Sequence, residues 1–467
     1  MNPTPFVFWD TETTGLNRAF HVPVEFGALV ADANLQPIRE INLACRPPRF
    51  VLPEPGALLT TGKSIGELLG RPASTYQATC RFAQEVQAAT PTCFVTYNGV
   101  SFDDPLIQHT FYRHLHDPYL MLKGGNCRVD LLKLVQLAFA LGQGGLEVPR
   151  SEKGVSFKLD RIAPLNGFEE RGAHSAAVDS RAVSHLARLI AQRAPDLWNR
   201  AVYLWSRKKA VFDLVGCADV IVQFSWDWRK GGSPAFKALV PIGAGRSYAG
   251  DFVCLDLAAD PSEYESLAPE ELIDKITVGA KPRPICTIRL NGVPIIFRRD
   301  DPLVVGRVPV DDKVAQRIRR DAGLRERILD AVDLHRDRFE EPEHTEQQLY
   351  SGGFFSDRDV SALERFHQVA PEMKLHVSTT FDDTRLRYLA QRLIYEEWPA
   401  VLPLEMRCRF DAELLHRCLS VAECPWVTLS AGINAIDELL PGADDGDRAI
   451  LIEYREYLMR YSLPKAA

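Results

Sequence analysis

The sequence predicts an α/β domain followed by a β-rich segment and a helical segment. Within the first 195 residues, short apolar runs precede and then alternate with stretches of helical spacing, as in mixed α/β domains. From about 205 to 310, short β-prone runs are separated by turns rich in Gly, Pro and Asp, which is typical of a small barrel or open sheet. From about 356 onward, apolar residues recur at helical spacing. A chain of 467 residues is also too long for one core, so several domains are expected.

The first domain is predicted to start with a three-stranded meander. "FVFWD" at residues 6–10 is apolar and β-prone, and the two runs within residues 25–47 are broken by the turn-like "DANLQP". Period-two and period-3.6 patterns then predict the remaining elements. They are a helix at 74–89, a buried strand at 92–99, a helix at 103–116, an amphipathic helix at 128–141 and a helix at 173–193.

The rest of the chain is predicted to form two further domains. Strands are expected at 219–226, 237–244 and 251–257, and two more within 284–297, followed by a helix at 313–339. The polar stretch "EEPEHTEQQ" at 340–348 is expected to be a linker. The predicted division is 1–195, 196–345 and 346–467.

Composition indicates a cytoplasmic protein that does not enter membranes. No apolar run approaches the roughly 20 residues that span a bilayer, and the N-terminus lacks the features of a signal peptide. The ten cysteines include no CxxC pair and no Cys/His group with zinc spacing, so we expect reduced thiols. The net charge of -7 argues against bulk coating of nucleic acid but permits a local basic groove.

The first candidate site is the end of the first strand, where Asp10 and Glu12 stand two positions apart. Side chains at i and i+2 of a strand share a face, so both carboxylates can reach one hard cation. A strand that merely ends at a solvated loop would look the same.

Two later segments supply further acids. "TYNGVSFDDPL" ends a strand at Asn98 and opens a helix with Asp103 and Asp104. Helix capping explains Asp104 well and leaves Asp103 available. In "HSAAVDSRAV", we place His174 at or before a helix start and Asp179 inside the helix among small and apolar residues. Taken alone, His174 could be an ordinary surface or capping residue.

Together the three segments predict a metal site. Four carboxylates gathered in a core would repel one another and become protonated without cations. Mg²⁺ takes hard oxygen ligands, and two such ions about 4 Å apart can stabilise the attacking and leaving oxygens in phosphoryl transfer.

The motif order resembles the histidine-bearing branch of the DEDD exonucleases, whose fold is ribonuclease-H-like. Asp-x-Glu in "DTETTGL", then "NxxxFD", then His-x4-Asp carry this resemblance. "PEPGALLTTGKS", "YNGVSFDDPLIQHTFYRHLHDPY", "NCRVDLLKLV" and "EQQLYSGGFFSDRD" narrow it to the bacterial exonuclease I family. The resemblance runs from residue 6 to beyond 460 and is strongest before 190. It implies a ribonuclease-H-like domain, a Src-homology-3-like β-barrel domain with flanking helices, and an α-helical C-terminal domain.

By motif position, the resemblance implies that Asp10, Glu12, Asp103 and Asp179 hold two Mg²⁺ ions, with Mn²⁺ as a substitute. It makes His174 the general base for the attacking water. The expected activity is 3′→5′ degradation of single-stranded DNA to 5′-mononucleotides, in DNA repair and recombination. The family tends to have Arg where "SFKLDRI" has Lys158, and "TGI" where this chain has Lys63.

The expected substrate contacts are spread over four regions of the chain. Aromatic and basic residues interleave in "FSWDWRKGGSPAFKALV", a pattern that suits stacking of bases and tracking of phosphates, although a barrel core with a solvated basic turn would look alike. The full set of expected substrate contacts is Glu12, Tyr119, Lys123, Arg128, Lys158, Trp228, Arg229 and Lys230.

The resemblance also implies a protein partner, and other functions stay open. Exonuclease I enzymes bind the acidic C-terminal tail of single-strand DNA-binding protein, and the basic run at 319–327 lies in the half expected to do so. We expect a monomer. The alternatives are an RNA-trimming exoribonuclease of the same superfamily and an inactive single-strand-binding adaptor. The two extra domains argue against the first, and the intact acids and His174 argue against the second.

Overall fold

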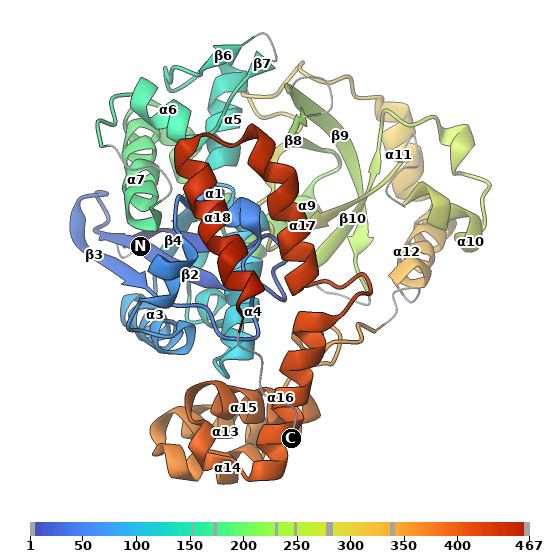
Figure 1. Ribbon diagram of the computed structural model, residues 1–467. Coiled ribbons are helices and arrows are strands. Elements are labelled where there is room, and N and C mark those ends of the chain that lie inside the picture. The colour runs from blue at the N-terminus through green and yellow to red at the C-terminus, as the bar shows by residue number, and fades with distance from the viewer. Residues whose placement is uncertain are drawn as a thin grey trace.

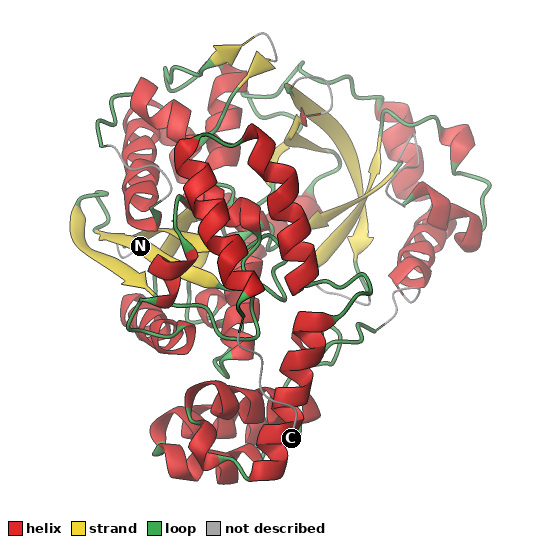
Figure 2. Ribbon diagram, in the orientation of Figure 1, coloured by secondary structure: helices red, strands yellow, loops and turns green. Residues whose placement is uncertain are grey.

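A computed structural model gives the fold over residues 5–151, 154–170, 175–228, 232–246, 250–276, 284–336 and 341–461. Two separate five-stranded sheets organise it, with helices around both (Figures 1 and 2). His174, Arg229 and Lys230 fall outside the described residues. Within them, no helix combines the length and apolar character needed to cross a membrane.

The first sheet has the strand order β3-β2-β1-β4-β5. β1, β2 and β3 pair antiparallel, whereas β4 and β5 continue the sheet in parallel. This mixed sheet with helices on both faces confirms the ribonuclease-H-like prediction. The bounds are β1 Phe6–Thr13, β2 Pro23–Ala31, β3 Pro37–Ala44, β4 Cys93–Thr96 and β5 Cys127–Asp130.

Alternate residues of β1 face different helices, as the period of a strand requires. Val7 and Trp9 pack with α3 (Thr75–Ala89) and α4 (Asp103–Arg113). Phe6 and Phe8 pack with α5 (Leu131–Leu141) and α7 (Ala176–Arg193). The next residues on this second face are Asp10 and Glu12, so the two acids point to the side of the sheet that α7 covers.

The helix predicted at 128–141 begins three residues later than expected. Arg128, Val129 and Asp130 form the end of β5 and pair with β4, and α5 starts at Leu131. Helical spacing continues through these residues in the sequence, but the edge of the sheet offers the backbone a ladder of hydrogen bonds, and tertiary pairing overrides the local pattern.

The second sheet has the order β11-β10-β9-β8-β12, with every neighbouring pair antiparallel. All five predicted strands are present, and α11 and α12 pack on the sheet. The predicted helix 313–339 is broken at Asp321 into these two helices. The bounds are β8 Ile221–Asp227, β9 Ser233–Ala244, β10 Asp251–Asp256, β11 Ile285–Arg289, β12 Ile295–Arg298, α11 Asp312–Arg320 and α12 Ala322–Arg336.

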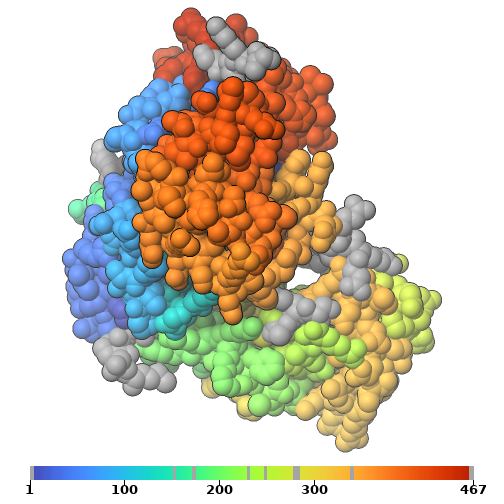
Figure 3. Space-filling model, turned by 90° about the horizontal axis from the view of Figure 1, so that it is seen from below, coloured from blue at the N-terminus to red at the C-terminus, as the bar shows by residue number. Residues whose placement is uncertain are grey.

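The helical region packs as two pieces rather than one. Helices α13 to α16 bury their apolar faces against Phe50, Tyr76 and Tyr112 of the first region, which is the part of the chain that forms the first sheet and its helices. In Figure 3, the orange atoms of these helices lie directly over the blue atoms of the first region. Helices α17 and α18 instead cover α1 and α2, and they lie in front of the first sheet in Figure 1. The bounds are α1 Pro55–Thr61, α2 Ile65–Leu69, α13 Asp357–Gln368, α14 Pro371–Ser378, α15 Thr384–Glu397, α16 Leu404–Leu419, α17 Leu429–Leu439 and α18 Asp445–Met459.

The stretch predicted as a linker is anchored in the core by Glu346. This carboxylate is 2% exposed and accepts hydrogen bonds from Arg392 and Arg417. Burial alone would raise the pKa of Glu346, but the two guanidinium groups outweigh burial and hold the pKa well below its usual range. Residues 345–347 also form a short 3₁₀ turn, so the segment fixes the helical region in place.

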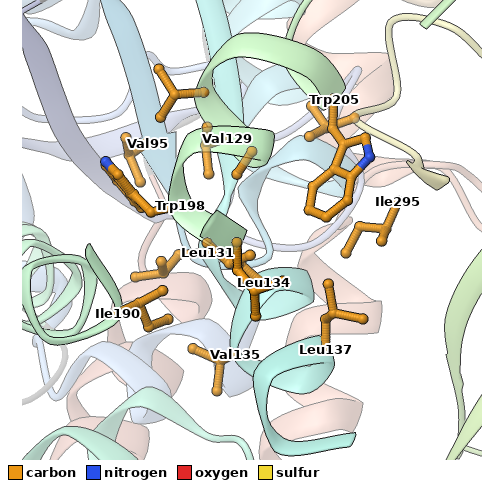
Figure 4. Packing of buried hydrophobic residues seen from close by; sticks show 14 of the residues in the cluster. Val95, Val129, Leu131, Leu134, Val135, Leu137, Ile190, Trp198, Trp205 and Ile295 are labelled. Carbon is orange, nitrogen blue, oxygen red and sulfur yellow. The ribbon is translucent and has the colours of Figure 1, made fainter. Parts of the chain in front are cut away.

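One apolar core joins the first sheet to the second. In Figure 4, Val95 and Val129 of the first sheet lie beside the apolar face of α5, and the core continues through Trp198 and Trp205 to Ile295 of β12. The indole of Trp205 donates to the carbonyl of Ile296 at 2.8 Å. The connecting elements and the remaining short ones are α6 Leu159–Leu165, α8 Pro195–Arg200, the π-helical turn Ala201–Trp205, α9 Lys208–Cys217, α10 Pro269–Leu272, β6 Arg150–Ser151 and β7 Gly154–Val155.

Candidate active site

Three carboxylates meet at the end of β1. Each of Asp10, Glu12 and Asp179 offers an oxygen, and these oxygens all lie within 4.8 Å of one another. Asp10 and Glu12 come from one face of β1, and Asp179 from the first turn of α7. The structure therefore brings together three of the four predicted acids from two distant segments.

Gly27 explains how α7 comes so close to the strand. It is the β2 partner of Asp10, and a Cβ atom there would lie only 2.0 Å from the backbone of Ala176. Because glycine has no Cβ, the first turn of α7 can rest on the sheet at this point. Asp179, one turn further along, then faces the strand that carries Asp10 and Glu12.

Asp103, the fourth predicted acid, lies beside this group. It opens α4 and is 6% exposed. Its Oδ1 accepts a hydrogen bond from the hydroxyl of Thr11 on β1. The turn before α4 needs Asn98 in the left-handed region, with a φ of 68°, where asparagine is tolerated. Sequence reasoning found Asp103 and missed Thr11, because a threonine in a strand carries no signal of its own.

Asp104 takes a different role from its neighbour. Its carboxylate is buried and forms an ion pair with Arg128 of β5. The guanidinium of Arg128 also donates to the carbonyl of Asn291. The predicted capping role is refined by this finding: Asp104 lies in the first turn of α4, and its partner is a side chain from the neighbouring strand.

Burial and mutual repulsion raise the pKa values of the clustered acids. Burial is the main cause at Asp10, whose pKa is raised well above the usual value, and the charges of Asp103, Asp179 and Glu12 add to it. Burial and the charge of Asp179 raise the pKa of Glu12 to about 8. Burial raises the pKa of Asp103 to about 6, against the opposing effect of the Thr11 hydrogen bond. Without cations, several of these groups would hold protons at neutral pH.

This donor set suits a hard divalent cation. It consists of carboxylate oxygens, which Mg²⁺ prefers, and a bound cation would remove the repulsion that raises the pKa values. Lys63 lies nearby, with its Nζ 3.2 Å from Oε1 of Glu25, and its charge lowers the pKa of Glu12. The lysine that departs from the "TGI" pattern therefore sits next to the acid cluster.

The predicted DNA-contacting residues lie in different environments. Lys158 is exposed at the start of α6. Trp228 is 56% exposed and packs edge-on against Trp226 and Phe157. Trp226 itself packs against the core, so for this residue the barrel-core interpretation describes the contacts better than base stacking does.

Tyr119, Lys123 and Arg128 line one groove of about 940 Å³. The same groove is lined by a basic run that the sequence analysis did not single out, Arg207, Lys208 and Lys209, and by the aromatic rings of Tyr350 and Phe354. Because Arg128 is paired to Asp104, next to Asp103, this wall of the groove is linked directly to the acid cluster. The "RKK" sequence at 207–209 could have indicated this basic run, because it lies where the α/β pattern gives way to the β-rich pattern near residue 205.

Comparison with known proteins agrees with this geometry. Residues 7–186 match the exonuclease family, and residues 343–461 match the exonuclease I C-terminal domain. The exodeoxyribonuclease I of Escherichia coli (strain K12) is 27% identical over 421 residues, covering 85% of this chain and 86% of that protein. The acidic cluster accords with the divalent-metal use of the exonuclease family.

Solved structures give the same result over nearly the whole chain. Exonuclease I from Methylocaldum szegediense has a TM-score of 0.86 at 26% identity and covers 98% of this chain and 99% of its own. E. coli exonuclease I in complex with a dT13 oligonucleotide has a TM-score of 0.83 at 25% identity, covering 97% and 99%. The acid-lined strand end, the match at each end of the sequence and the shared fold lead to one conclusion: the chain belongs to the exonuclease I family.

Proposed function

We propose that this protein is a Mg²⁺-dependent exonuclease that degrades single-stranded DNA from its 3′ end and releases 5′-mononucleotides. The observation that carries this proposal is the meeting of Asp10, Glu12 and Asp179 within 4.8 Å at the end of β1. The exodeoxyribonuclease I relatives, one of them solved with a dT13 oligonucleotide, support DNA as the substrate class, and the motif resemblance implies digestion from the 3′ end.

The proposed mechanism assigns each residue one task. Asp10, Glu12, Asp103 and Asp179 would hold the metal ions, with Mn²⁺ as a working substitute for Mg²⁺. When bound, two such ions stabilise the attacking and leaving oxygens of the phosphodiester. We assign His174, which precedes α7, to take a proton from the attacking water, because an imidazole that titrates near neutrality suits this task.

The bond changes in this reaction balance as a hydrolysis. The water oxygen forms a bond to phosphorus, and the bond from phosphorus to the 3′ oxygen of the penultimate nucleotide breaks. That oxygen takes up a proton, which leaves a shortened strand with a 3′-hydroxyl and a free 5′-mononucleotide. The water proton passes to His174 and then to solvent.

We further propose that the strand follows the groove lined by Lys123, Arg128 and the basic run Arg207–Lys209. Basic side chains there can neutralise phosphates, and the rings of Tyr119 and Phe354 can stack on unpaired bases. Lys158 and Trp228 remain proposed contacts, and so do Arg229 and Lys230, which fall outside the described residues. Support comes from the groove lining and from the exposure of Trp228 and Lys158.

The proposed biological setting is DNA repair and recombination in the cytoplasm, by a monomer. The ten cysteines, none of which forms a disulfide, fit a reducing compartment. We propose that single-strand DNA-binding protein binds with its acidic tail near α11. The exposed Arg319 and Arg320 of that helix support this proposal. A labelled acidic-tail peptide should bind the full chain and lose affinity when Arg319 and Arg320 are changed to Ala, while light scattering should give a monomer mass.

One digestion experiment tests the proposed activity. Single-stranded DNA, duplex DNA and RNA, each labelled at one end, are incubated with the full chain with and without Mg²⁺. We expect 5′-labelled single-stranded DNA to shorten progressively from its 3′ end, only when Mg²⁺ is present. Preferential loss of RNA would establish the exoribonuclease alternative, and binding without digestion would establish the adaptor alternative. Either result would overturn the proposed substrate or activity.

A further inference from the structure

A second group of possible metal ligands lies on the other side of the first sheet from the acid cluster. Cys80 of α3, His116 in the loop after α4, and His367 of α13 each offer a ligand atom, and these atoms all lie within 4.8 Å of one another. Helices α3 and α4 pack on the face that carries Val7 and Trp9, whereas Asp10 and Glu12 point toward α7. The two groups are therefore separate sites.

His367 is held in the orientation that a metal ligand requires. Its Nε2 lies 3.0 Å from the carbonyl oxygen of Leu115, and since a carbonyl only accepts, Nε2 carries the hydrogen. Its Nδ1 therefore has a lone pair, which faces Sγ of Cys80 at 3.8 Å. Metal-binding histidines generally donate their second ring N–H to an oxygen acceptor in this manner. Sulfur and nitrogen ligands of one tetrahedral Zn²⁺ ion lie about 3.5 Å apart, given the usual bond lengths.

His116 provides an independent indication. Its ring stacks on that of His367, with centroids 4.0 Å apart and an angle of 9° between the planes, so the ring of His116 would turn on binding to aim its in-plane lone pair at the same ion. The Nε2 atom of His116 is buried and has no hydrogen-bond partner among the described residues. Buried polar atoms without partners are uncommon and point to an absent ligand, ion or water. Burial lowers the pKa of both imidazoles, which keeps them in the neutral form that binds metals.

The surroundings allow a cation to enter. All three side chains line a cavity of about 670 Å³ between the first region and α13, which can supply a water as a fourth ligand. Two neighbours compete with a metal. The hydroxyl of Tyr76 lies 3.2 Å from Nδ1 of His367 and would have to release it. The ammonium of Lys374 repels a cation but also favours the thiolate of Cys80, whose pKa burial raises to about 11.

We propose that Cys80, His116 and His367 form a site for a thiolate- and imidazole-binding divalent cation of the Zn²⁺ class. Binding releases the thiol proton of Cys80 to solvent, because a coordinating thiol is deprotonated. Two ligands come from the first region and one from α13 of the helical region. The bound ion would therefore link the helical region to the first region. The ligand types differ from the all-oxygen acid cluster, which separates the two sites by metal preference.

Cobalt substitution tests this proposal on the full chain. Co²⁺ bound to a thiolate shows a sulfur-to-metal charge-transfer absorption in the near ultraviolet, and the acid cluster contains no sulfur. We expect this absorption to saturate at one equivalent of Co²⁺ and to be displaced by Zn²⁺. Cys80→Ser should abolish it. His116→Gln should weaken Co²⁺ binding by at least the roughly tenfold to hundredfold cost of losing an outer-shell partner.

Matched controls keep each outcome decisive. Cys408 is half-buried like Cys80 and lies outside the cluster, so Cys408→Ser should leave the absorption unchanged. Asp10→Asn should also leave it unchanged, because that residue belongs to the acid cluster. Circular dichroism confirms the fold of each variant, and His116→Gln tests the site independently if Cys80→Ser does not fold. The proposal is overturned if the full chain shows no thiolate absorption with Co²⁺, or if Cys80→Ser retains it.

Discussion

The hydroxyl of Thr11 donates a 2.5 Å hydrogen bond to Oδ1 of Asp103. This contact joins β1 to the first turn of α4 and holds the fourth acid beside the other three. The hydrogen bond favours the ionised carboxylate and so opposes the rise in the pKa of Asp103 that burial causes. Thr11 is therefore a positioning residue for the acid cluster.

Thr11→Val should move the acid limb of the pH–rate profile to higher pH. Without the hydrogen bond, the pKa of Asp103 rises above about 6, so less of it is ionised at a given pH. A hydrogen bond to a charged group contributes about 1.5–3 kcal/mol, which corresponds to a shift of about one to two pH units. Thr110→Val, on α4 and also buried, is the matched control. An unchanged limb in Thr11→Val would show that this bond does not tune the site.

Glu12→Gln should stabilise the metal-free protein at pH 8 but not at pH 4. The pKa of Glu12 is about 4.5 when unfolded and about 8 when folded, so the folded state binds more protons between these values and stability falls as pH rises. Glutamine removes this loss, which is on the order of 4 kcal/mol at pH 8. Urea unfolding in a chelating buffer at both pH values measures it. Equal effects at pH 4 and pH 8 would contradict the assignment.

His174→Ala should lower turnover by roughly 10²–10⁴-fold, the usual contribution of a general base. Metal affinity should stay unchanged, because the acids hold the ions. His185→Gln is a suitable control, since His185 also comes from the α7 segment and contacts the carbonyl of Asn166 at 2.9 Å. If the His174→Ala enzyme keeps the wild-type pH–rate profile, another group activates the water.

Lys208→Ala should weaken single-strand binding and shorten the tract digested per encounter. Each lost phosphate contact flattens the log–log salt dependence of binding to single strands by about 0.7. The exposed Lys313 of α11 lies outside the groove, so Lys313→Ala should leave the slope unchanged. Binding across a salt series, and digestion of a long strand with excess unlabelled trap, provide the two readouts. A slope that Lys208→Ala does not alter would remove the groove from the DNA path.

The sequence predicted that the acids meet, because local pattern and chemistry coincide in their segments. Asp10 and Glu12 follow an apolar strand, and Asp179 interrupts an apolar helix face, so each acid is conspicuous in its own segment. Arg128 to Asp130 were assigned wrongly to a helix, because pairing with β4 outweighs their helical spacing.

Other features depend on contacts that no local pattern encodes. Glu346 sits in a polar stretch typical of linkers, yet residues 46 and 71 positions away bury it with their guanidinium groups. Cys80, His116 and His367 are likewise too far apart in the chain to show zinc spacing, and only the packing of α13 on α3 brings them together. Thr11 and the basic run at 207–209 gain significance only from the side chains that the fold sets beside them.

The central claim is that the carboxylates at the end of β1 hold the catalytic metal ions, and Asp179→Asn tests it most directly. Asp196 lies in the first turn of α8, as Asp179 lies in the first turn of α7. Asp196 is exposed and lies outside the acid cluster, so Asp196→Asn is the matched control. The purified variants are compared for Mg²⁺-dependent release of mononucleotides from 5′-labelled single-stranded DNA, and for DNA binding in a chelating buffer. We predict that Asp179→Asn nearly abolishes cleavage and retains binding, while Asp196→Asn retains both. Substantial cleavage by Asp179→Asn at saturating Mg²⁺ would contradict the account.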